Sequence, residues 1–283
     1  MDGIIIIDKP KNITSRDVVN HVCKRLNTKK IGHTGTLDPI ATGVLVLCVG
    51  KATKLVELLT CEDKEYVATV KLGILTDTLD TEGKVIEEKK VFLDKEELTK
   101  VLNSFIGEYD QEVPIYSAIK INGKKLYEYA RKNKKVELPK RKVAIKSIKL
   151  LESNDDSYKF KVVVSKGTYI RSLIKDINDR LNIIGVMSDL RRTRQGKFCL
   201  GESYTLNDID NNKYKILSIN DVLKNEKCVI IDDTLYKLIK NGGIIDNKYD
   251  DEYVTFVYND NIVAIYKVYS KDNTKMKPYK MFV

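Results

Sequence analysis

The segment GHTGTLDPIATGVL, Gly32 to Leu45, places a single carboxylate, Asp38, among turn-forming, small and aliphatic residues. Its glycines and its proline break regular structure, so the segment is predicted to be a loop. The run Val44–Gly50 that follows is apolar throughout and rich in β-branched residues, which is typical of a central strand. The chain must therefore carry Asp38 on a loop that ends in a buried sheet. Asp38 is either part of a structural Asp-Pro turn or a carboxylate held for chemistry.

The first 200 residues alternate between strand-like and helix-like segments. Short apolar runs predict strands, and apolar residues at helical spacing behind a capping residue predict helices. The predicted strands are Gly3–Asp8, Glu65–Gly73 and Phe160–Ser165. The predicted helices begin after Thr14 or Ser15, after Asp94, and after the turn at Lys166-Gly167. This alternation indicates a mixed α/β domain.

Arg171 falls in the first turn of the third predicted helix, away from its apolar stripe. A cation there opposes the helix dipole at a cost of about 0.3–1 kcal/mol. Such a violation of a local rule often marks a functional position, and Arg171 needs a carboxylate or phosphate partner. Asp38 would fit, because a neighbouring cation keeps a carboxylate ionised.

Positive charge is concentrated in two segments of a chain whose formal net charge is +10. That balance favours a polyanionic partner such as nucleic acid, although a general bias toward lysine would also produce it. Lys120–Lys142 interleaves basic residues with tyrosines, which indicates either a flexible clamp on a nucleic-acid backbone or a solvated helix face. Asp189–Phe198 brings together arginines suited to phosphates.

The sequence argues against several other classes of protein. Five dispersed cysteines without an export signal indicate free thiols, mostly filling the core. Two isolated histidines do not supply a zinc site, and the acidic loop Thr76–Val85 has Leu79 where a calcium loop needs an acid. No signal peptide or membrane-spanning run is present, so we expect a cytoplasmic protein.

The last third of the chain has a different pattern. The Asn/Asp-rich patch Asn207–Asn212 indicates a connector. From Cys228 onward, short strand-like segments alternate with turns, which predicts a small, mostly β module.

The Gly32–Leu45 segment resembles the active-site motif of the TruB family of tRNA pseudouridine synthases, with Asp38 at the catalytic aspartate. The likeness continues in order through IIIIDKP…TS, KEYVATVKLGILTDTLD, VPIYSAIKINGKKLYEYAR and SKGTYIRSL…DLRRT, over about residues 3–205. It implies a largely antiparallel sheet with flanking helices in a catalytic domain at 1–210, which carries a basic RNA-clasping insertion at about 120–142. A connector at 211–227 and a small PUA-like RNA-binding module at 228–283 would follow.

The resemblance implies that the protein flips uridine-55 out of the T loop of tRNA and isomerises it to pseudouridine. It also implies that the reaction needs no cofactor, metal, guide RNA or obligate protein partner. We expect the protein to be a monomer. Asp38 would attack the ribose or the uracil ring, two routes that the sequence leaves open. Arg171 would pair with Asp38, and Tyr66 would stack on the base and could transfer a proton. His33 would help extrude the nucleotide, while Tyr169 and Leu190 would line its pocket.

Candidates for contact with the RNA backbone lie in the two basic segments. They are Lys124, Lys125, Arg131, Lys132, Lys134, Lys135, Arg191, Arg192 and Arg194. Two positions depart from the family pattern. Asn12 stands where a glycine is usual, and asparagine tolerates the left-handed backbone expected there. Val113 replaces a common proline.

Three other functions compete with this interpretation. An RNA-binding or RNA-folding protein would not need Asp38, Tyr66 and Arg171 together. A guide-RNA-directed relative would be expected to have an N-terminal extension and no basic insertion. A carboxylate-dependent hydrolase would need a second, well-placed acid, and the sequence does not place one persuasively.

Overall fold

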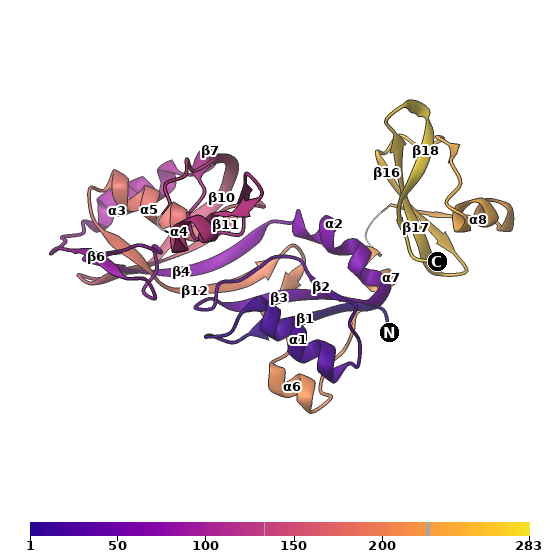
Figure 1. The fold of residues 1–283 in the computed structure, drawn as a ribbon. Helices are drawn as coiled ribbons and strands as arrows, with labels where there is room; N and C mark the ends of the chain where they lie inside the picture. The colour runs from indigo at the N-terminus through magenta and orange to yellow at the C-terminus, as the bar shows by residue number, and fades with distance from the viewer. Residues whose placement is uncertain (133, 225–226) are drawn as a thin grey trace.

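The computed structural model describes residues 1–132, 134–224 and 227–283 (Figure 1). Its main element is a nine-stranded sheet with the order β1-β3-β12-β4-β11-β10-β7, to which β2 adds beside β3 and β13 beside β12. The strands are β1 Gly3–Lys9, β2 Ile31–His33, β3 Thr42–Val49, β4 Lys64–Leu72, β7 Gly107–Glu112, β10 Lys140–Ser153, β11 Ser157–Val164, β12 Gly185–Gln195 and β13 Phe198–Cys199. Within the described residues its pairings are antiparallel except for that of β3 with β12. The predicted mixed α/β class and largely antiparallel sheet are confirmed.

Both faces of the sheet are covered at its first strands. Ile5 and Ile7 of β1 pack with helix α1 (Ser15–Arg25), whereas Ile4 and Ile6 point into a separate core. The continuous isoleucine run follows from this, because a strand covered on both faces is apolar at every position. Thr14 caps α1 in a capping box, as the sequence predicts.

Two helices, α3 (Lys95–Ser104) and α5 (Ile170–Arg180), cover the other half of the sheet beside β10 and β11 (Figure 1). Asp94 caps α3 by accepting the Glu97 N–H, and the apolar stripe of α5 is buried in the core.

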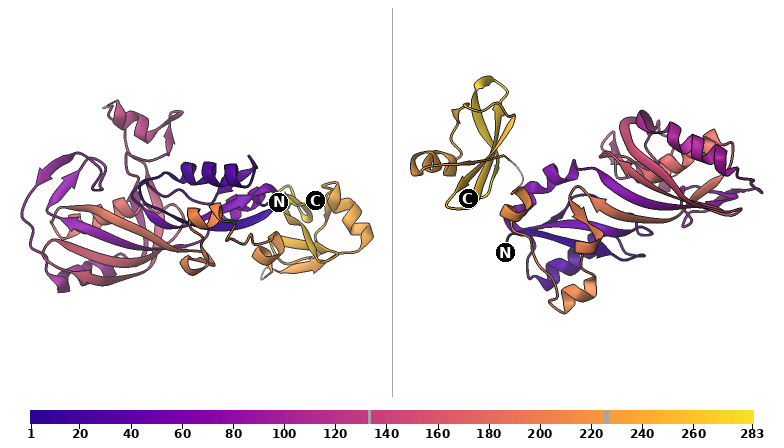
Figure 2. Two further views of the ribbon diagram at one scale, coloured as in Figure 1. Left: turned by 90° about the horizontal axis from the view of Figure 1, so that it is seen from below. Right: turned by 180° about the vertical axis from the view of Figure 1, so that it is seen from behind.

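Shorter elements fill the connections between these strands and helices. They are the 3-10 helices η1 Gly50–Leu55 and η2 Leu200–Glu202, helix α2 Val56–Thr60, the hairpin of β5 Ile74–Thr76 with β6 Val85–Glu88, and the hairpin of β8 Lys120–Ile121 with β9 Lys124–Lys125, which leads into α4 Leu126–Arg131. The acidic loop thus becomes the turn of the β5–β6 hairpin. The basic insertion is defined as Lys120–Lys142. Its part around α4 projects away from the large sheet, whereas Lys140–Lys142 already belong to β10 (Figure 2).

The C-terminal residues form a second sheet at the opposite end of the molecule from α3 (Figures 1 and 2). It has the order β14-β16-β17-β18-β15. Its elements are β14 Cys228–Ile230, α8 Asp233–Lys240, β15 Ile245–Asp246, β16 Tyr253–Tyr258, β17 Asn261–Tyr269 and β18 Asp272–Met281. This small β-rich sheet fits the predicted PUA-like module, although α8 had no counterpart in the sequence interpretation.

Two expectations about the fold and the cysteines are wrong. The patch Asn207–Asn212 is not a simple connector, because most of it forms α6 (Leu206–Asp210), which is capped by Thr205 and contacts α1 through Asp210 and His21. Capping by a Thr with an acid three residues later is a local signal that the polar composition obscured. The cysteines are free as expected, but they do not mostly fill the core. Cys48 is buried, Cys23 is half-buried, and the other three are exposed.

Part of the predicted connector, 211–227, packs against the large sheet. Leu217 pairs with Ile4 of β1, and α7 (Ile219–Leu223) buries Val222 and Leu223 in the core that contains Ile4. Residue 133 of the basic insertion and residues 225–226 of this segment lie outside the described part of the chain. None of the helices formed by the described residues is long and apolar enough to cross a membrane.

Candidate active site

The loop that carries Asp38 joins β2 to β3 and is fixed from beneath by buried polar groups. The Ser15 hydroxyl accepts the Leu37 N–H at 2.8 Å and lies 3.1 Å from the carbonyl oxygen of the same residue. The buried Lys9 ammonium donates to backbone carbonyls that include Pro39 O, directly after Asp38. Burial lowers the pKa of Lys9 to about 8. The position of the carboxylate is therefore set by the end of β1 and the start of α1.

A residue in the left-handed backbone conformation also supports the Asp38 loop. Asn12 has a φ of 68°, as expected from the glycine that usually stands there, and its N–H donates to Pro39 O at 2.8 Å. Asparagine adopts this conformation at little cost, so the turn is preserved.

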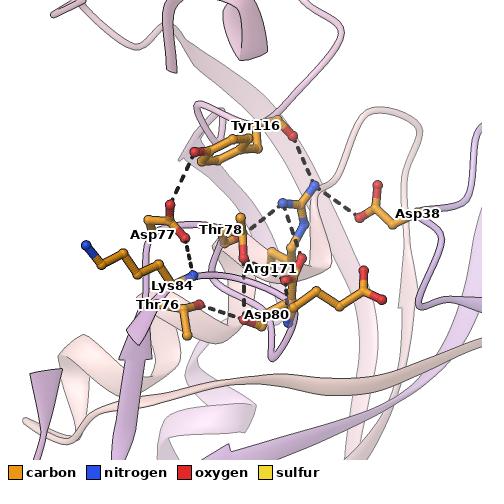
Figure 3. Close-up of polar contacts among 9 residues, drawn as sticks. Asp38, Thr76, Asp77, Thr78, Asp80, Lys84, Tyr116 and Arg171 are labelled. Carbon is orange, nitrogen blue, oxygen red and sulfur yellow. Dashed lines mark hydrogen bonds and ion pairs between the residues drawn. The ribbon is translucent and has the colours of Figure 1, made fainter. Parts of the chain in front are cut away.

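Arg171 reaches from the first turn of α5 to the Asp38 loop (Figure 3). Its Nη2 lies 3.0 Å from Asp38 Oδ2 and donates to Tyr116 O at 3.1 Å. Its Nη1 donates to Thr78 O at 2.9 Å and lies 3.6 Å from Asp80 Oδ2. The expected ion pair is present, but the guanidinium is buried, at 8 % side-chain exposure, rather than at the surface. Asp38 is 38 % exposed, so its carboxylate is accessible from solvent.

Asp80 is the functional candidate that sequence reasoning missed. It lies in the acidic loop Thr76–Val85, which the sequence interpretation considered only as a calcium site, and it is a second acid at the guanidinium of Arg171. Its Oδ1 accepts the Thr78 hydroxyl at 2.6 Å and the Glu82 N–H at 3.1 Å, which leaves Oδ2 toward Arg171. No local pattern singles out Asp80, because the burial of Arg171, which favours a second negative charge beside it, is decided by the tertiary structure.

Asp38 and Arg171 open onto a cavity of about 440 Å³. This volume lies within the range of small-ligand sites, which is roughly 300–1,000 Å³. Of the residues predicted to bind the base, Tyr66, Tyr169 and Leu190 all line it. Tyr66 and Leu190 are almost fully buried, and they project from the adjacent strands β4 and β12. The structure thus brings together five of the six predicted site residues.

Tyr169 is held by its backbone at the start of α5. Its N–H donates to Gln111 Oε1 at 2.8 Å, and its carbonyl accepts from Gln111 Nε2 at 3.1 Å. Burial is the main cause that raises the pKa of Tyr169, so its hydroxyl is neutral.

His33 is the predicted residue that does not line the cavity. It ends β2, and its buried Nδ1 has no hydrogen-bond partner within the described part of the chain. Burial, followed by the charges of Arg16 and Arg192, lowers the pKa of His33 and keeps its ring neutral.

Arg192 was expected to contact the RNA backbone, and this prediction is wrong. Its side chain is 1 % exposed, Nε donates to Val44 O at 2.6 Å, and Nη2 donates to Gly35 O at 3.0 Å. It belongs to the wall of the cavity, with Nη1 3.5 Å from the Tyr66 hydroxyl. Because successive residues of a strand point to opposite faces of the sheet, Arg191 points away from Arg192.

The neighbouring arginines remain only partly accessible. Arg191 pairs with Asp8 at 2.8 Å, and Arg194 donates to Gly196 O at 2.9 Å. A buried lysine that was not predicted, Lys64, also lines the cavity, and burial lowers its pKa to about 8.

The basic insertion presents most of its predicted cations to solvent. Lys125 is half-buried, with its ammonium 5.4 Å from the ring centroid of Tyr127, which itself lines the cavity. The exposed ones are Lys124, Arg131, Lys132, Lys134 and Lys135. The insertion therefore carries exposed positive charges and also contributes a residue, Tyr127, to the lining of the cavity.

The fold and the site together define a pseudouridine synthase. The fold is similar to that of a chain in the structure of an H/ACA RNP bound to a substrate RNA containing 2'-deoxyuridine, with a TM-score of 0.73 and 26% identity, covering 99% of this chain and 85% of that one. Residues 24–170 match the N-terminal domain of the TruB family of pseudouridylate synthases. The chain belongs to this family.

Full-length relatives extend the match beyond that domain. The protein of Lactobacillus acidophilus called tRNA pseudouridine synthase B is 40% identical over 94% of both chains. Its namesake in Clostridium kluyveri is 42% identical over 94% of this chain and 92% of its own.

Proposed function

We propose that this protein isomerises uridine-55 in the T loop of tRNA to pseudouridine. Relatives that match nearly the whole chain carry the name tRNA pseudouridine synthase B, which supports tRNA as the substrate. The choice of position 55 rests on the likeness of the Gly32–Leu45 motif. The observation that carries the chemistry is the Asp38–Arg171 ion pair at a cavity of nucleoside size.

The reaction is an internal rearrangement that needs no added atoms. The N1–C1′ bond of uridine breaks, the base rotates, a C5–C1′ bond forms, N1 gains a proton and C5 loses its hydrogen to solvent. Asp38 acts as nucleophile or base on the ribose or the uracil ring, because it is the partly exposed carboxylate at the cavity. Arg171 compensates its charge from the buried side.

The cavity walls hold the flipped base. Tyr66 offers a ring for stacking and a hydroxyl for proton transfer, while Tyr169 and Leu190 add to the lining. His33 acts on the nucleotide outside the cavity, during extrusion.

The basic insertion grips the RNA backbone of the T stem-loop. The insertion reaches the cavity through Tyr127, and its exposed cations are free to contact phosphates. Because the insertion supplies this grip from the chain itself, we propose a stand-alone monomeric enzyme that uses no guide RNA. Its catalytic domain would extend over 1–210, with the RNA-binding module at 228–283.

The test follows the hydrogen at C5. A T-arm RNA tritiated at uracil C5 is incubated with wild type and with Asp38→Asn, and tritium release and RNA binding are measured. Asp38→Asn keeps the side-chain size, so we expect no release and an RNA Kd within about 2-fold of wild type. A T-arm RNA with cytidine at the target position is the substrate control.

Two outcomes would contradict the proposal. Tight binding without release by either protein would make this chain an RNA-binding protein without the chemistry. Loss of binding together with activity in Asp38→Asn would make Asp38 a structural residue.

A further inference from the structure

The guanidinium of Arg171 is part of a closed ring of hydrogen bonds that runs through Tyr116, Asp77 and Thr78 (Figure 3). Nη2 donates to Tyr116 O at 3.1 Å, and Nη1 donates to Thr78 O at 2.9 Å. The ring is closed by the Tyr116 hydroxyl, which donates to Asp77 Oδ2 at 3.2 Å. The two backbone carbonyls that fix the guanidinium are therefore tied to each other.

Each side of the ring is anchored in a different part of the chain. Asp77 is fixed in the β5–β6 hairpin, because its Oδ1 accepts the Lys84 N–H at 2.8 Å. Tyr116 precedes the basic insertion and lines the cavity. Burial, followed by the charge of Asp77, raises the pKa of Tyr116, which keeps its hydroxyl protonated as a donor.

The segment after Tyr116 leads directly into the helix of the basic insertion. The Tyr127 N–H donates to Ser117 O at 3.2 Å, and the Leu126 N–H donates to Ile119 O at 2.8 Å. The start of α4 is thus bonded to residues 117–119, one to three positions after Tyr116. A displacement of α4 would be transmitted to the Tyr116 carbonyl.

The same nitrogen of Arg171 contacts both this segment and Asp38. Nη2 has two hydrogens, one for Tyr116 O and one for Asp38 Oδ2 at 3.0 Å. Moving the Tyr116 carbonyl therefore moves the donor that orients the Asp38 carboxylate.

We propose that Tyr116 is a positioning residue for the reaction, and that its hydrogen bond to Asp77 sets the Arg171–Asp38 geometry according to the position of the basic insertion. The inference rests on the proposed function. The binding of RNA by the insertion then affects the orientation of the Asp38 carboxylate through one ring of hydrogen bonds.

The experiment compares wild type, Tyr116→Phe, Asp77→Ala and the double variant. Pseudouridine formation is measured in single turnover at saturating T-arm RNA, and the RNA Kd is measured separately. Loss of one hydrogen bond predicts a rate reduced by about 3- to 10-fold in Tyr116→Phe, with a Kd within about 2-fold of wild type. The double variant should be no slower than the slower single variant, because both substitutions open the same ring.

Thr99→Val is the matched control. It removes another exposed hydroxyl hydrogen bond, from Thr99 to Lys95 O at 2.8 Å, in α3, which belongs neither to the site nor to the parts proposed to bind RNA. Its rate should equal that of wild type. Equal melting temperatures for Tyr116→Phe and Thr99→Val would separate positioning from a loss of folded protein.

Four results would overturn the inference. A wild-type rate in Tyr116→Phe, or rate losses that multiply in the double variant, would show that the ring does not position Asp38. Either result would leave the proposed function intact. A change confined to Kd would make Tyr116 an RNA contact instead. No pseudouridine from the wild type would remove the proposed function, and the inference with it.

Discussion

Replacing Asp80 by asparagine tests whether the second carboxylate sets the position of Arg171. The substitution keeps the shape of the side chain, and the amide oxygen can still accept from Thr78 and Glu82 as Oδ1 does. It removes the negative charge that lies 3.6 Å from Arg171 Nη1. It also turns an amide N–H₂ toward the guanidinium, so that a donor faces a donor.

The magnitude follows from distance and burial. At 3.6 Å and an effective dielectric constant of about 20, the attraction is about 4–5 kcal/mol. Desolvation of two side chains that are 8 % and 9 % exposed offsets part of it, and we expect a net loss of about 2–3 kcal/mol. If that loss appears in the transition state, the rate falls by about 30- to 150-fold.

The assay is single-turnover pseudouridine formation together with thermal unfolding. Because Arg171 stays buried with one carboxylate fewer, the melting temperature should also fall, by about 4–10 °C. Asp246→Asn is the control, since its exposed pair with Lys275 should contribute little to stability. A rate within about 2-fold of wild type and an unchanged melting temperature for Asp80→Asn would refute this account of the arginine.

Two further predictions concern RNA binding and the packing of the sheet. The first removes three exposed charges of the basic insertion, with the substitutions Lys132→Ala, Lys134→Ala and Lys135→Ala. It should weaken tRNA binding and reduce the slope of log K against log salt by about 2–3. An unchanged slope would show that this stretch is only a solvated face. Gly43→Ala should lower the free energy of unfolding by about 3 kcal/mol or more, because φ is +100° and a Cβ would lie 2.2 Å from Arg192 O. Gly201→Ala is its control in denaturant unfolding, since a Cβ there meets nothing within 4 Å, and equal stability of the two variants would contradict the reasoning.

Local features of the site could be predicted from the sequence because their causes are local. The loop around Asp38 follows from its glycines and proline, the start of α1 from the Thr14 cap, and the left-handed turn from the tolerance of Asn12 for positive φ. The placement of Arg171 against the helix dipole predicted a charged partner, and the structure supplies one in Asp38.

The sequence by itself determined these elements, because they depend on interactions between residues a few positions apart. It also determined that Arg171, in the first turn of α5, requires an acidic partner. Only the tertiary structure decided that Asp80 shares the guanidinium, that Arg192 is buried in the cavity wall, and that the insertion is tied to Arg171 through Tyr116. Burial and ion pairing depend on which elements pack on each face of the sheet. Those contacts join residues far apart in the chain, and no local pattern encodes them.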